Sequence, residues 1–220
     1  MQFIQFIFAS MLEYITFSIF AMVLFRFSVK EHIVKFCLSS FILALVSNTL
    51  QVESLQNISP VINVFLLVFL LSIILRIRLL HSIIMVILSY LVYTLVQWLL
   101  LTIFIKFGLF SEIKPYTFSG YILQASSAAM LVLISYFILV TNGGFSYIRA
   151  SSRFFKEEVK GNRLFLVTLV ISLFVVFVVN AMYIGSVGLP QYFYTIAIVI
   201  ILVLVILIYF STRKDNKNDK

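Results

Sequence analysis

The chain has 220 residues, of which 63% are hydrophobic and 11% charged, with a formal net charge of +8 and a mean hydropathy of +1.15. Soluble domains carry about 25% charged residues, because the polar part of the chain must cover the apolar part. This composition excludes the water-soluble globular classes. It predicts an all-α fold, a polytopic bundle of transmembrane helices that forms a single domain over residues 1–210.

Seven apolar runs are long enough to be membrane spans, since a helix crosses about 30 Å of hydrocarbon with about 20 residues. In chain order the predicted spans are Phe3–Phe25, Ile33–Leu50, Ser59–Leu75, Ser82–Ile105, Phe118–Val140, Leu164–Ile184 and Tyr192–Phe210. The second and third are the shortest, and a re-entrant pair in place of two crossings is the alternative for them. Pro60 suits the first turn of the third helix and marks its start.

The distribution of basic residues predicts the orientation of the bundle. With the N-terminus outside and the C-terminus in the cytoplasm, 14 of the 16 Lys and Arg residues lie on the cytoplasmic side. Cytoplasmic loops carry the excess of Lys and Arg in membrane proteins. The segment Gln51–Asn57 contains Glu53 and no basic residue, which favours an external turn and therefore seven crossings.

Glu13 lies near the middle of the first predicted span. A carboxylate there costs roughly 2.5–3.5 kcal/mol on insertion scales, but 13 Leu, Ile, Phe and Val residues of the same span together contribute about 4–8 kcal/mol. The apolar residues therefore outweigh the cost of the carboxylate, so the span still inserts into the membrane. Glu13 should then face the bundle interior. It is either a ligand, proton or signalling site, or a neutral acid that hydrogen-bonds Gln97, Asn63 or Asn180 on another helix.

The segment 141–163 is predicted to be an amphipathic cytoplasmic loop. Apolar residues recur there at spacings of three and four, which is typical of a helix lying on the inner leaflet. Its basic residues are Arg149, Arg153, Lys156, Lys160 and Arg163. Two interpretations remain open, a docking surface for a cytoplasmic partner and an interfacial helix that only fixes the topology. The polar tail Ser211–Lys220 is predicted to be disordered.

The sequence does not support catalysis, so we expect no enzyme. A His-Glu-x-x-His zinc pair is absent, and Cys37 is the only cysteine, which excludes a thiolate metal cluster. No metal and no cofactor are expected. Nucleic acid is not an expected partner, since the basic residues lie along one membrane face, where anionic lipid headgroups neutralise them. The expected partners are the lipid bilayer and a cytoplasmic or membrane protein.

The layout of Phe3 to Phe210, in its span count, orientation, length and aromatic-aliphatic texture, resembles the membrane sensor region of peptide-pheromone receptor histidine kinases of the accessory-gene-regulator type. In that family a cytoplasmic kinase follows the last span, whereas only Ser211–Lys220 follows here. The resemblance implies a sensor-like or regulatory protein that binds a hydrophobic peptide or a lipid and acts through a partner. We expect it in a cell membrane as a multi-pass protein, in a bacterial plasma membrane.

Two other functions are open. The first is an immunity or accessory membrane protein that sequesters an antimicrobial peptide. The second is a small transporter or channel with Glu13 in its pathway. Sensing and sequestration predict binding without flux, whereas transport predicts substrate movement that fails in Glu13→Gln.

Overall fold

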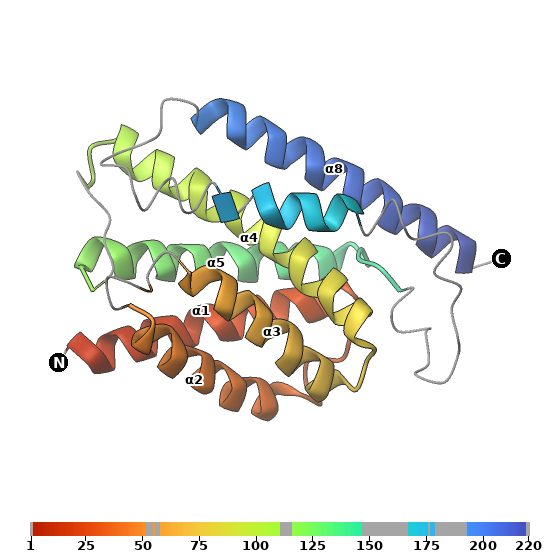
Figure 1. Cartoon of the computed structure of the whole chain (residues 1–220), viewed down its shortest axis with the longest axis horizontal. Helices are drawn as coiled ribbons and strands as arrows, with labels where there is room; N and C mark the ends of the chain where they lie inside the picture. Colours follow the sequence, from red (N-terminus) through yellow and green to blue (C-terminus); the bar gives the residue numbers. More distant parts are fainter. Residues whose placement is uncertain are drawn as a thin grey trace.

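The computed structural model describes residues 2–51, 55, 58–110, 116–146, 167–175, 177–178 and 193–218. Every regular element in these ranges is a helix, as the composition predicts. The helices with defined bounds are α1 (Gln2–Leu24), α2 (Ile33–Thr49), α3 (Ser59–Leu75), α4 (Leu79–Lys106), α5 (Phe118–Val140) and α8 (Phe193–Asn218). Residues 167–175 and 177–178 are also helical. The helices lie lengthwise beside one another, and the two termini lie at opposite ends of the bundle (Figure 1).

Three of the described helices are long and apolar enough to cross a membrane: α1 from Phe3, α4 and α5, with 22, 28 and 23 residues. The helices α2 and α3 have 17 residues each, or about 26 Å at 1.5 Å per residue. They are also apolar but shorter than the hydrocarbon core of about 30 Å. The bounds of α3 and α5 coincide with the predicted spans, and α4 begins three residues before the predicted Ser82. The predicted span Leu164–Ile184 lies partly outside the described residues.

The prediction of a disordered tail is wrong for residues 211–218. Helix α8 continues through this polar segment to Asn218. Ser211 is fully buried, and Asp215 accepts hydrogen bonds from the backbone N–H and the hydroxyl of Ser146, at 2.8 and 2.7 Å. A tertiary contact therefore holds a segment that composition alone assigns to solvent.

At each end of the bundle, residues that are far apart in the sequence contact one another. At one end, which we call the Tyr116 end, the ring of Tyr116 stacks on Phe6 with centroids 4.6 Å apart, and its hydroxyl donates to Asn48 Oδ1 at 2.9 Å. At the other, which we call the Arg26 end, Arg26 donates from Nε and Nη2 to the carbonyls of Gly143 and Asn142, at 3.0 and 2.7 Å. Both ends join α1 to α5, so these two helices are parallel neighbours.

Gly144 makes the Arg26 end possible. Its φ is +90°, and a Cβ added to it would lie 2.8 Å from the carbonyl oxygen of Leu24. Only a residue without a side chain combines this conformation with so close an approach. The next residue, Phe145, is buried and donates its N–H to the same Leu24 oxygen at 2.8 Å. Phe145 therefore belongs to the core, although it lies within the segment 141–163 that is predicted to be an amphipathic cytoplasmic loop. Residues 147–163 of that segment lie outside the described residues.

The Arg26 half of the bundle is packed with large apolar side chains. Large side chains of α1, α2, α3, α4 and α5, with Phe25 just after α1, are less than 2% exposed there and belong to one cluster. They are Phe20, Met22, Phe25, Phe36, Leu43, Leu71, Ile84, Met85, Leu88, Leu91 and Leu131. Helix α2 also reaches the opposite end, where Ala44 packs with Phe6 and Ile7.

Many buried hydroxyl groups donate to a carbonyl oxygen of their own helix. Ser127 and Ser135 each donate to the carbonyl four residues earlier, both at 2.7 Å. An exception joins two helices, because Ser82 of α4 donates to the carbonyl oxygen of Val68 in α3 at 2.6 Å. The small residues Ser127 and Ala128 are buried and let α5 pack closely on its neighbours.

Candidate functional site

A polar cavity of about 240 Å³ lies inside the bundle around Glu13. Five helices or their connections contribute to its wall. Its described lining residues are Glu13, Tyr14, Phe17, Ser47, Gln51, Ser59, Pro60, Asn63, Val64, Leu67, Tyr90, Tyr93, Gln97 and Gln124. More than half of these side chains carry a polar group, which contrasts with the apolar cluster beside them.

Glu13 is half-buried in this wall. Its carboxyl group hydrogen-bonds the side chain of Gln124 on α5. The hydroxyls of Tyr14 and Tyr90 lie near enough to interact with it electrostatically, and the Tyr14 hydroxyl also hydrogen-bonds Ser47 on α2. Glu13 therefore lies where α1, α2, α4 and α5 meet.

Aromatic rings form a second part of the wall. The rings of Phe17 and Tyr93 meet edge to face with centroids 6.1 Å apart. The ring centroid of Tyr93 in turn lies 6.1 Å from that of Tyr90, with the two ring planes tilted by 40°. Together with Tyr14, they place four aromatic side chains around a cavity that contains one carboxyl group.

Two amide oxygens in the wall have no hydrogen-bond partner among the described residues: Gln51 Oε1 and Asn63 Oδ1. Asn63 is only 8% exposed, and its Nδ2 is already used by a donated bond to Ser59 Oγ at 3.4 Å. An unpaired buried acceptor costs about 1–3 kcal/mol. Acceptors that face a cavity recover this free energy when water or a ligand donates to them.

The cavity occupies the half of the bundle nearer to the Tyr116 end. Its lining reaches Gln51 and Pro60 at the connection between α2 and α3, and on the other side it stops at Phe17 and Leu67. Beyond these residues the apolar cluster of the Arg26 half begins. Among the described residues, the cavity therefore ends against packed side chains on this side.

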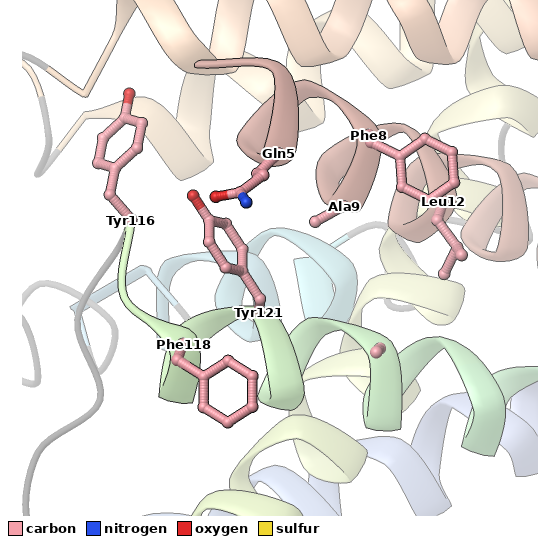
Figure 2. Close-up of a pocket in the computed structure, with 8 residues that line it drawn as sticks. Gln5, Phe8, Ala9, Leu12, Tyr116, Phe118 and Tyr121 are labelled. Carbon is pink, nitrogen blue, oxygen red and sulfur yellow. The ribbon is translucent and has the colours of Figure 1, made fainter. Parts of the chain in front are cut away.

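A larger, apolar hollow of about 480 Å³ lies between side chains of α1 and side chains at the start of α5 (Figure 2). It is lined by Gln5, Phe8, Ala9, Leu12, Tyr116, Phe118, Tyr121 and Ala125. Phe8 and Phe118 are mostly exposed. Leu12 and Ala125 of this hollow are sequence neighbours of Glu13 and Gln124, so one helix contact separates the two spaces.

The structure brings some of the predicted site residues together, whereas others lie outside the described residues. Glu13, Asn63 and Gln97 line the same cavity, although the side chain that pairs with Glu13 is Gln124, which the expected set of Gln97, Asn63 and Asn180 does not include. Asn180 lies outside the described residues, as do Arg149, Arg153, Lys156, Lys160 and Arg163. The tyrosines Tyr14, Tyr90 and Tyr93 were missed, because tyrosine in a span is also common as an interface residue.

No metal-ligand group of three or more His, Cys, Asp and Glu side chains occurs in the part of the chain that the structure describes. No family model, curated protein or solved structure matches the chain.

Proposed function

We propose that the chain is a seven-span, sensor-like membrane protein that binds a ligand from the outer side in the Glu13 cavity and acts on a partner. In this arrangement the Tyr116 end faces outward and the Arg26 end faces the cytoplasm. The distribution of basic residues supports the orientation. The passage of α2 from Phe36 at one end to Ala44 near the other supports a crossing helix over a re-entrant one.

The end of the cavity among the described side chains is the observation that carries the proposal. A transport path needs polar or small side chains through the full thickness of the bundle, even if the path opens to only one side at a time. Here the polar wall stops at Phe17 and Leu67, and side chains such as Phe25 and Leu88 fill the remaining distance. Such a geometry favours binding without passage.

The ligand class expected from the layout, a hydrophobic peptide or a lipid, does not suit the Glu13 cavity. Its volume is below the roughly 300 Å³ at which sites for drug-sized ligands begin, and much of its wall is polar. A lipid chain fits the apolar hollow between Phe8 and Phe118 better. We therefore assign a small polar ligand to the cavity and a hydrophobic one to the hollow.

Binding in the cavity has a route to the cytoplasmic end. A ligand that pairs with Glu13 competes with Gln124 and thereby changes the contact between α1 and α5. The same two helices meet again where Arg26 holds the carbonyls of Asn142 and Gly143. A difference in ligand affinity between two α1–α5 arrangements would shift their populations, and the partner would detect the shift at the Arg26 end.

Cysteine accessibility tests the proposal cleanly, because Cys37 is the only native cysteine. In a Cys37→Ser background, Ser47→Cys places a thiol in the cavity wall. Ser40→Cys is the matched control, since Ser40 is fully buried and lies two turns closer to the Arg26 end on the same face of α2. Both variants are treated with a membrane-impermeant methanethiosulfonate reagent, in intact cells and in inverted vesicles.

We expect Ser47→Cys to react only from outside and Ser40→Cys to react from neither side. Reaction of Ser47→Cys from both sides would instead indicate alternating access. That outcome supports the second candidate, a transporter that uses Glu13, which the position of this acid inside a cavity also favours. Reaction from the cytoplasmic side alone would overturn the proposed orientation.

A further inference from the structure

The chemistry of the Glu13 cavity points to one class of small ligand, and we infer that it binds a protonated primary amine. The inference rests on the proposed function in one respect, that a ligand reaches the cavity. It adds the charge and the hydrogen-bonding character of that ligand. Three features of the wall carry it: the sign of its charge, its aromatic rings and its unpaired acceptors.

The charge of the wall selects against anions. Glu13 is the only acidic side chain among the described lining residues, and none of them is Lys, Arg or His. An anion would have no opposite charge to meet in a region where charges are weakly screened. A cation would pair with Glu13 and relieve the cost of an isolated carboxyl group in the membrane.

The aromatic rings distinguish an organic ammonium from a metal ion. The contiguous rings of Phe17, Tyr93 and Tyr90 line the cavity together with Tyr14, and ammonium groups are attracted to the faces of aromatic rings within about 6 Å. A divalent metal ion needs several hard oxygen ligands, usually with more than one carboxylate. Glu13 has no second acid beside it in the described wall.

The unpaired acceptors distinguish a primary amine from a quaternary one. Gln51 Oε1 and Asn63 Oδ1 have no donor among the described residues, and the Glu13 carboxyl group is a third acceptor. An ammonium group of the type R–NH₃⁺ carries three N–H donors. A quaternary ammonium has none, so it would leave both amide oxygens unpaired.

The test uses the full chain in nanodiscs of zwitterionic lipid, so that lipid headgroups do not bind the probes. Calorimetric titration compares 2-phenylethylammonium with two molecules of similar size, the neutral 2-phenylethanol and the anionic phenylacetate. Charge-assisted hydrogen bonds contribute more than neutral ones, so we expect the amine to bind roughly tenfold to hundredfold more tightly than the alcohol. We expect no measurable binding of phenylacetate. This comparison needs no variant and therefore does not depend on the folding of one.

Variants test whether the preference for the amine depends on side chains of the cavity wall. Glu13→Gln should lower the affinity for 2-phenylethylammonium to that for 2-phenylethanol, whereas the same change at the exposed Glu31 should leave both unchanged. Phenyltrimethylammonium, which has no N–H group, should bind more weakly than 2-phenylethylammonium to the wild type. Asn63→Leu should reduce that difference, because it removes one of the three acceptors.

Several results would overturn the inference and leave the proposed function standing. They are equal or tighter binding of the alcohol or the carboxylate, no binding of any probe, and displacement of the amine by equimolar sodium or potassium ions. The proposed function fails separately, when Ser47→Cys is not labelled from outside.

Discussion

Substitution of Gly144 by alanine should destabilise the bundle more than the same substitution of Gly108 or Gly143. The new Cβ would need a positive φ, which costs about 1–2 kcal/mol for a residue with a side chain. It would also lie 2.8 Å from the Leu24 carbonyl oxygen, which must move and thereby weaken the hydrogen bond from Phe145, a further 0.5–1.5 kcal/mol or so. The expected loss is about 1.5–3.5 kcal/mol.

Two other glycines separate these causes. Gly108 has a φ of +66° but no atom within 4 Å of an added Cβ, so Gly108→Ala measures the backbone cost alone. Gly143 has an ordinary φ, and its nearest neighbour is 3.4 Å away. Gly143→Ala should therefore change stability little, or raise it by restricting the unfolded chain.

The assay is reversible unfolding in mixed micelles with a rising fraction of sodium dodecyl sulfate, which reports differences in the free energy of unfolding. We expect the losses to increase in the order Gly143→Ala, Gly108→Ala and Gly144→Ala. If Gly144→Ala and Gly108→Ala cost the same, the close approach of residue 144 to the end of α1 would be incorrect.

Three further predictions concern hydrogen bonds between segments that are distant in sequence. Arg26→Lys should lower the free energy of unfolding by up to about 1 kcal/mol in the same micelle assay, because a lysine ammonium cannot make the two forked hydrogen bonds of Arg26 to the carbonyls of Asn142 and Gly143. An unchanged free energy of unfolding would argue against this contact between α1 and α5. Asp215→Ala should release the end of α8 from Ser146 and speed trypsin cleavage in the tail, with Asp215→Asn in between since it keeps one acceptor; equal cleavage rates in all three proteins would contradict the contact. Ser82→Ala should cost about 1 kcal/mol, measured by unfolding, because the hydrogen bond to the Val68 carbonyl is lost; a stabilised variant would refute that bond.

Much of the helical architecture was predictable because it depends on local properties of the chain. A run of apolar residues forms a helix in lipid wherever the backbone has no other hydrogen-bond partner. For this reason the bounds Ser59–Leu75 and Phe118–Val140 agree with the structure residue for residue. The disordered tail was predicted by the same local logic and is wrong up to Asn218, since its contact with Ser146 joins residues 69 positions apart.

Hydropathy alone also identified Glu13 as the residue that needs an explanation, because a carboxyl group within an apolar run is costly wherever the run lies. It could not identify the residue that meets Glu13. That depends on the rotation of each helix about its axis and on which helices are neighbours, and several polar residues in different spans satisfy the pattern equally well. The sequence by itself therefore determined the helices and the unusual acid, whereas packing in three dimensions decided the pairing with Gln124, the cavity around Glu13 and the close contact at Gly144.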